Sequence, residues 1–145
     1  SGSDEVVARA RTWLEFCVNN HRQCHRPPSQ LPKRILDLGH GTRPLNVKLH
    51  ETRGEVEKYA ALSYPWGTEV PLKTLATNLD SHLKGIQIET FSRTLRQSIM
   101  FARRLGFRYL WIDALYIIQD DADDWAEQAA QMASIFSSAS ITISA

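Results

Sequence analysis

The chain has 145 residues, enough for one domain with a hydrophobic core of its own. Hydrophobic residues make up 43% and charged residues 23%, a composition that excludes a disordered chain. A formal net charge of +1 and short apolar runs argue against binding to nucleic acid or insertion into a membrane, and two cysteines without a signal sequence indicate a cytoplasmic protein.

The first part of the chain is predicted to hold a helix and a proline-rich linker. Ser1, Gly2 and Ser3 are typical of a cloning remnant, and residues 4–32 form the helix and linker. Over 4–20, apolar residues recur at helical spacing and predict one buried face made of Val6, Ala10, Trp13, Leu14, Cys17 and Val18. Prolines at positions 27, 28 and 32 then favour extended backbone.

Residues 33–145 are predicted to form one α/β domain. Strands are expected over 34–38 and 46–51 as an antiparallel hairpin, and over 58–64 as the first strand of a parallel sheet. The elements expected next are helices over 78–83 and 92–105, a strand over 108–113, a helix over 121–137 and a strand over 141–144. This alternation is typical of a parallel sheet with flanking helices in three layers, and it leaves open whether the domain is C-terminally truncated.

The last of these helices carries apolar residues at helical spacing. They predict an inward face made of Trp125, Ala129, Met132, Ile135 and Phe136. Of the other tryptophans, Trp66 and Trp111 are interpreted as core residues rather than as platforms for a cofactor. The arginines of 93–108 are interpreted as a solvated face, with binding of a phosphate or an acidic partner as the alternative.

Candidate ligand-binding residues follow two of the predicted parallel strands. Open parallel sheets bind ligands beyond the carboxyl ends of their strands. The residues at these positions are Ser63, Tyr64, Trp66 and Gly67 after one strand, and Gln119 and Asp121 after the other. Because Ser63 lacks the Gly-x-Ser-x-Gly pattern, a serine hydrolase is not expected.

Aspartates are concentrated between positions 113 and 124. Acidic residues in the first turn of a helix stabilise its start, and we prefer this interpretation for Asp120, Asp121, Asp123 and Asp124. A ligand role is the alternative for Asp113 and Asp120, because crowded carboxylates shift their pKa values or bind a cation. Their spacing does not fit a calcium-binding loop.

Two cysteines and two histidines lie within nine positions near the end of the first helix. We expect Cys17 and Cys24 to be buried thiols and His21 and His25 to lie at the surface, with a metal site or a Cys17–Cys24 disulfide as alternatives. No metal site is predicted, because structural zinc sites usually draw their ligands from two separated pairs.

Several motifs together resemble the fungal heterokaryon incompatibility (HET) domain. They are the run from Tyr59 to Gly67 (YAALSYPWG), the pair Asn78-Leu79, the run from Arg104 to Asp113 (RLGFRYLWID), the run from Ile117 to Asp121 (IIQDD), Asp124-Trp125 and Met132. The pattern runs in register from about Arg34 to Ala145. The preceding Trp13, Leu14, Cys17, His21 and Cys24 resemble the segment that often leads into this domain.

The resemblance implies a fungal, cytoplasmic protein of non-self recognition that induces cell death. It implies action through association with protein partners or with itself, and no cofactor. Because the family is similar in turn to Toll-receptor-type (TIR) domains, the resemblance also implies a TIR- or flavodoxin-like fold.

The TIR likeness implies an alternative function, cleavage of NAD or a related nucleotide as substrate. The glutamate that such an enzyme needs has no counterpart here, so a catalytic site would consist of Asp113, Asp120 and Glu127. The chain also departs from the family pattern at Pro65, Gln97 and Tyr116, the last of which often is cysteine. Whether the protein is an enzyme is left open.

Overall fold

The computed structural model describes residues 4–40, 45–65 and 72–145, which fold around a mixed five-stranded sheet. The strand order is β3-β2-β6-β5-β7. The strands are β2 (Arg34–Asp37), β3 (Lys48–Glu51), β5 (Ala60–Ser63), β6 (Tyr109–Trp111) and β7 (Ile141–Ser144). A separate antiparallel pair joins β1 (Ser29–Gln30) to β4 (Val56–Glu57).

Three of the five strands are parallel, as the sequence predicts. β5 pairs in parallel with β6 on one side and with β7 on the other. The connection from β5 to β6 contains α2 (Leu79–Lys84), the 3₁₀ turn η2 (Ile88–Thr90) and α3 (Arg93–Arg104). The connection from β6 to β7 contains α4 (Asp113–Tyr116), α5 (Ala122–Ala129) and α6 (Met132–Ser138). The first connection leads from β5 to its neighbour β6, and the second leads from β6 to β7, which lies on the other side of β5.

The predicted hairpin belongs to the same sheet. β2 and β3 pair antiparallel, with Ile35 opposite His50, and β2 also pairs antiparallel with β6. The hairpin therefore extends the parallel strands by two, which makes the sheet mixed. Gly39, two residues after the end of β2, has a φ of 79°, a left-handed conformation that favours glycine.

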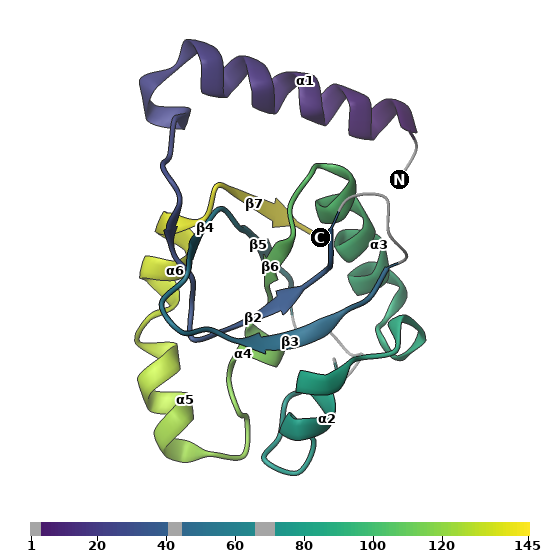
Figure 1. The fold of residues 1–145 in the computed structure, drawn as a ribbon, viewed down its shortest axis with the longest axis vertical. Helices are drawn as coiled ribbons and strands as arrows, with labels where there is room; N and C mark the ends of the chain where they lie inside the picture. The colour runs from purple at the N-terminus through teal and green to yellow at the C-terminus, as the bar shows by residue number, and fades with distance from the viewer. Residues whose placement is uncertain (1–3, 41–44, 66–71) are drawn as a thin grey trace.

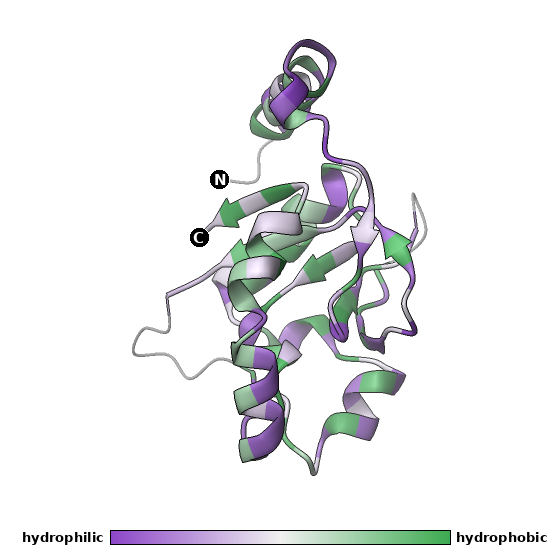
Figure 2. Ribbon diagram, turned by 90° about the vertical axis from the view of Figure 1, so that its left-hand side faces the viewer, coloured by the Kyte–Doolittle hydropathy of each residue, from purple (hydrophilic) through white to green (hydrophobic). Residues whose placement is uncertain are grey.

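Apolar side chains cover both faces of the sheet, so the domain has three layers. On one face Ala60, Leu62 and Leu110 pack against Leu95 and Ile99 of α3. On the other face Ala61, Tyr109 and Trp111 of the same strands pack against α4 and α6, together with Tyr59, which directly precedes β5. Figure 1 shows α3 on one side of the sheet and α5 and α6 on the other. In Figure 2 hydrophobic segments are visible both in the strands and along parts of the helices.

The helix α1 (Asp4–Asn20) has the predicted bounds, and its predicted inward face is confirmed in part. The half-buried members of that face are Ala10, Leu14, Cys17 and Val18. Val7 is its buried residue, with Leu14 packed against the core, whereas Trp13 is 67% and Val6 40% exposed. The buried face is therefore rotated away from Trp13. α1 lies beyond the three layers (Figures 1 and 2). Among the described helices, none combines the length and apolar character needed to cross a membrane.

The predicted helix over 121–137 is two helices, α5 and α6. Its predicted inward face is confirmed at four positions and wrong at Trp125; the four that pack in the core are Ala129, Met132, Ile135 and Phe136. Trp125 is 53% exposed, so its placement in the core was wrong. The buried residues of α5 are Asp124 and Gln128, and Ile135 continues this face in α6. A polar buried face explains the error, because a search for apolar periodicity cannot find it.

Candidate functional site

The carboxyl ends of β5, β6 and β7 lie at one edge of the sheet, as expected for parallel strands. Ser63 ends β5 with an exposed side chain, and the half-buried Tyr64 packs against the core. The backbone N–H of Ala145, after β7, donates to the carbonyl of Ser63 at 3.1 Å. Trp66 and Gly67, predicted for the same site, lie outside the described residues.

Asp113 follows β6 at this edge, but it begins a helix instead of ending a strand. It is the first residue of α4, and one of its carboxylate oxygens accepts a hydrogen bond from the N–H of Ala114 at 2.7 Å. Its side chain is half-buried. The register of β5 and β6 pairs Ala61 with Trp111, so Ser63 and Asp113 each follow that pair by two positions at the carboxyl ends of neighbouring strands.

Gln119 and Asp120 attach the acidic segment, residues 113–124, to the segment that precedes α2. The side-chain amide of Gln119 donates to the carbonyl of Ile117 at 3.3 Å, and its backbone N–H donates to the carbonyl of Thr74 at 2.9 Å. The carboxylate of Asp120 accepts from the N–H of Ala76 at 2.8 Å. Asp120 was interpreted as a helix-start residue; its carboxylate instead bridges two connections of the fold.

Asp121 is the N-cap of α5, as the preferred interpretation of the sequence predicts. Its carboxylate accepts hydrogen bonds from the N–H groups of Asp123 and Asp124, at 3.1 and 3.0 Å. These bonds satisfy two donors that have no partner within the helix. The contacts explain Asp121 as a structural residue, and its ligand role stays an untested prediction.

The three predicted catalytic carboxylates contact different parts of the molecule. Asp113 bonds within α4 and Asp120 bonds to Ala76, while Glu127 is exposed and lies 4.0 Å from the ammonium group of Lys33. Within residues 4–40, 45–65 and 72–145, these three do not form a cluster tight enough to hold a metal ion. The geometry therefore adds no support for a shared catalytic centre.

A buried ion pair that sequence reasoning missed joins β2 to α5. The guanidinium of Arg34, 1% exposed, donates to both carboxylate oxygens of Asp124, 7% exposed, at 2.5 Å. Arg34 also donates to the carbonyl of Tyr116 at 2.7 Å, and the N–H of Ile118 donates to Asp124 at 2.9 Å. Burial raises the pKa of Asp124, but the N–H of Ile118 and the Arg34 guanidinium outweigh it and hold the pKa below its usual value.

Two buried tyrosines make further hydrogen bonds on the same face of the sheet, to α5 and α6. The hydroxyl of Tyr116 donates to the side-chain oxygen of Gln128 at 2.5 Å, and that of Tyr59 donates to the carbonyl of Ile135 at 2.6 Å. Burial raises the pKa of each tyrosine to about 12, so both are neutral and act as donors. Tyr116, one of the positions at which the chain departs from the resembled pattern, is thus a buried residue with a hydrogen-bonding role.

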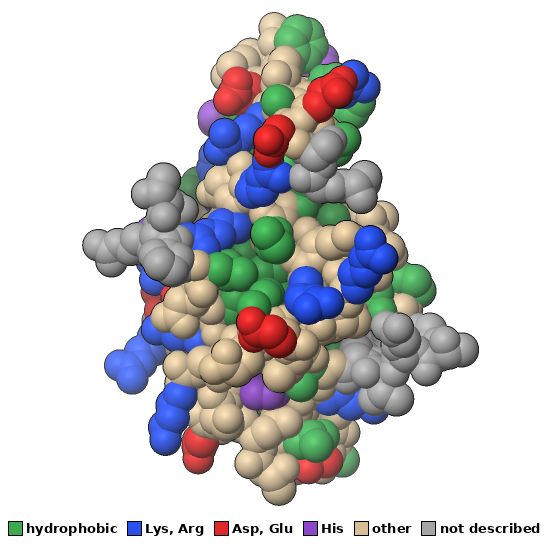
Figure 3. Space-filling view, turned by 90° about the vertical axis from the view of Figure 1, so that its right-hand side faces the viewer, with side chains coloured by type: hydrophobic (Ala, Val, Ile, Leu, Met, Phe, Trp, Pro, Cys, Tyr) green, Lys and Arg blue, Asp and Glu red, His purple; other side chains and the backbone are tan. Residues whose placement is uncertain are grey.

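The arginines near the end of α3 are not all a solvated face. The guanidinium of Arg108 donates twice to the carboxylate of Asp37, at 3.0 Å each. Burial raises the pKa of Asp37, but the bonds from Arg108 and one from the N–H of Gly39 have the opposite and larger effect. The pKa of Asp37 is therefore below its usual value. Arg104 bonds to Asp4 of α1. In Figure 3, Lys and Arg side chains are spread around a central hydrophobic group instead of forming one patch.

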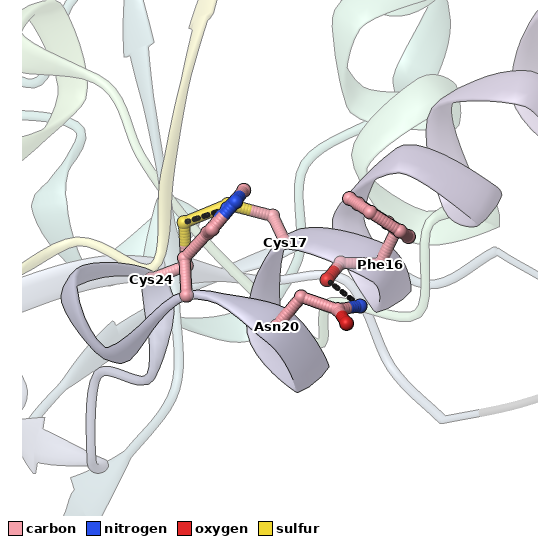
Figure 4. Close-up of a disulfide and its surroundings, with 5 residues drawn as sticks. Phe16, Cys17, Asn20 and Cys24 are labelled. Atoms are coloured by element: carbon pink, nitrogen blue, oxygen red, sulfur yellow. Dashed lines mark hydrogen bonds between the residues drawn. A yellow bond between two sulfur atoms is a disulfide. The ribbon is translucent and has the colours of Figure 1, made fainter.

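Cys17 and Cys24 form a disulfide, so the expectation of two buried thiols was wrong. α1 ends at Asn20, and the 3₁₀ turn η1 (Arg22–Cys24) folds back until the two Cα atoms are 5.7 Å apart, a separation that a disulfide can span. Both cysteines are half-buried rather than buried. Figure 4 shows the bond at the end of the helix, beside the hydrogen bond from the Asn20 amide to the carbonyl of Phe16.

The fold and its edge define an α/β domain in which three parallel strands direct their carboxyl ends to one rim. Residues 59–145 match the family model described as Heterokaryon incompatibility protein (HET). This match covers more than half of the chain, so the protein belongs to the HET family, and a HET domain implies a role in heterokaryon incompatibility. The match begins just before β5, later than the resemblance from Arg34. No curated protein and no solved structure matches the chain significantly.

Proposed function

We propose that this domain induces cell death in fungal non-self recognition, and that it acts in the cytoplasm through association with protein partners or with itself. The observation that carries the proposal is the family match over residues 59–145, which spans all three parallel strands. No cofactor is part of the proposed action.

The two edges of the sheet support association through β7. The edge strand β3 contains Lys48, His50 and Glu51, and charged side chains hinder the pairing of a further strand. The opposite edge strand β7 reads Ile-Thr-Ile-Ser, without charge or proline. In the described part of the chain β7 is an edge strand, and an uncharged edge strand is suited to pairing with a further strand. Association by strand addition at β7 is therefore the mechanism that the sheet favours.

The test places a charge on β7 and measures association and cell death together. Thr142 is exposed, and Thr142→Lys should keep the fold while it weakens strand addition. Thr12→Lys, an exposed position of α1, is the matched control. Light scattering over a range of concentrations measures association, and dye exclusion after induced expression in fungal cells measures death. We expect Thr142→Lys to reduce both and Thr12→Lys to change neither; killing by Thr142→Lys at the wild-type level contradicts the proposed mechanism.

The alternative, cleavage of NAD or a related nucleotide, is tested on the purified chain. The observation that favours it is that Asp113 directly follows the carboxyl end of β6, where open parallel sheets bind ligands. Product formed faster than by an Asp113→Asn/Glu127→Gln variant would establish an enzyme. If the domain acts by association and is not an enzyme, the wild type and the double variant form equal amounts of product. Asp113→Asn would then reduce cell death only if the Asp113 side chain contacts a partner.

A further inference from the structure

A cluster of two sulfur atoms and one imidazole forms where α1 ends. The ligand atoms of Cys17, His21 and Cys24 all lie within 4.8 Å of one another, and the Cys24 sulfur is 4.0 Å from Nδ1 of His21. Backbone hydrogen bonds fix this turn: the N–H of His21 donates to the carbonyl of Cys17 at 2.9 Å, and that of Cys24 donates to the carbonyl of His21 at 3.0 Å. These backbone bonds do not involve the sulfur atoms, so they add to the disulfide in shaping the turn that carries the three side chains.

We propose that these three residues bind a zinc ion when the disulfide is reduced. Zinc prefers thiolate and imidazole ligands, and a tetrahedral site separates its ligand atoms by about 3.4–3.8 Å. The distance from the Cys24 sulfur to Nδ1 of His21, 4.0 Å, is close to this spacing, whereas the two sulfur atoms are bonded and must move apart after reduction. Three protein ligands leave a fourth position for water or for a ligand from a partner. This proposal replaces the sequence-based expectation of no metal, which rested on spacing along the chain and not on geometry.

The two states of the site exclude each other, because each sulfur forms either the disulfide or a bond to the metal. Reduction takes up two electrons and two protons from a dithiol, which itself becomes a disulfide, and yields two thiols. Binding of Zn²⁺ then releases the proton of each thiol to solvent. Metal affinity therefore requires reducing conditions and falls as the pH is lowered.

The site lies at the junction between α1 and the rest of the domain. Cys24 lines a cavity of about 280 Å³ together with Leu14 and Val18 of α1 and with Phe107 and Tyr109 of the sheet side. Two residues after Cys24, the guanidinium of Arg26 donates to the carbonyl of Ala139 at 3.4 Å. A change from the disulfide state to the metal-bound state would therefore affect the segment that connects α1 to the sheet.

The experiment compares metal binding by the reduced and oxidised chain. The chain is reduced with a phosphine, which does not supply competing thiols, and is titrated with Zn²⁺ against a coloured chelator. Co²⁺ serves as a spectroscopic probe, because tetrahedral thiolate coordination gives intense visible bands. We expect one equivalent of metal in the reduced chain and none in the oxidised chain. Absence of binding to the reduced chain overturns the proposal.

Variants identify the ligands. Cys24→Ser should abolish binding, and His21→Ala, at an exposed position, should weaken it by at least about tenfold without disturbing the fold. His25→Ala is the matched control, an exposed histidine of the same segment outside the cluster, and should bind like the wild type. Circular dichroism checks that each variant is folded. Equal affinities for the wild type and His21→Ala, or a loss in His25→Ala alone, overturn the assignment of ligands.

Discussion

The two faces of the sheet are covered in different ways. On the α3 face the helix contributes Leu95, Ile99 and Ala102, and these pack against strand residues without polar partners of their own. On the α5 and α6 face the first helix contributes Asp124 and Gln128, which bond to Arg34 and Tyr116. The α3 face (the apolar face) gains its stability mainly from apolar burial, and its buried Ser98 bonds within the helix to the carbonyl of Thr94 at 2.9 Å. The α5 and α6 face (the polar face) must satisfy a buried charge pair as well.

This difference predicts different responses to substitution. On the apolar face, a smaller side chain costs the transfer free energy and the cavity. On the polar face, loss of one partner also leaves the other partner buried without its hydrogen bond or counter-charge. The free-energy cost of this loss depends on whether the groups are ionised. The stability contributed by the polar face should therefore fall at acidic pH, where Asp124 takes up a proton.

The largest effect is expected from Trp111→Ala. Trp111 is 0% exposed and packs edge-on against Tyr116 and Phe136, at ring separations of 5.5 and 5.0 Å. The cavity should lower the free energy of unfolding by about 3–5 kcal/mol, measured by urea denaturation. Trp125→Ala is the control, and its exposed side chain should contribute less than about 0.5 kcal/mol. Equal losses in the two variants would contradict the layer structure.

Asp124→Ala should follow, with a loss of about 3 kcal/mol. The substitution leaves the Arg34 guanidinium buried, with the carboxylate of Glu51 at 3.9 Å as partial compensation. Asp123→Ala, an exposed position of the same helix turn, is the matched control and should change the free energy of unfolding little. A loss no larger than in the control would show that the buried pair is not needed for stability.

A smaller effect is expected on the pH dependence of stability. The pKa of Asp124 is lowered in the folded state, so its contribution is present above the unfolded value of about 3.9 and is lost as the pH falls through the folded pKa. Unfolding measured from neutral to acidic pH should show a shallower decline for Asp124→Asn than for the wild type. Asp37, whose pKa is lowered as well, leaves a residual decline in the variant. Parallel curves would argue against the linkage.

The smallest effect is expected from Asp121→Asn. Asparagine accepts the same two backbone hydrogen bonds and caps a helix nearly as well as aspartate, so the free energy of unfolding should fall by well under about 1 kcal/mol. Asp121→Ala removes both bonds and should cost about 1 kcal/mol. Thermal unfolding of both variants separates capping from any effect of charge, and identical melting of the two would exclude capping.

The difference between the faces also explains what the sequence could predict. The bounds of α1, α3 and β7 follow from apolar spacing and capping residues, and so do the three parallel strands. The buried pair of Arg34 and Asp124 could not be predicted, because 90 positions separate its members and no local pattern distinguishes them from surface charges. For the candidate site, strand order alone predicted the position of Ser63 and Asp113 at one rim. Side-chain partners such as that of Asp120 needed the tertiary structure.

The attachment of Thr74 to the acidic segment has a consequence for motion. Thr74 is 0% exposed, its N–H donates to the carbonyl of Ala114 at 3.1 Å, and its carbonyl accepts from the N–H of Gln119 at 2.9 Å. These bonds tie the connection before α2 to the connection after β6, so neither can open without breaking the contacts of the other. The amide protons of Thr74 and Gln119 should therefore exchange with solvent deuterium at one common rate, as members of a single cooperative unit.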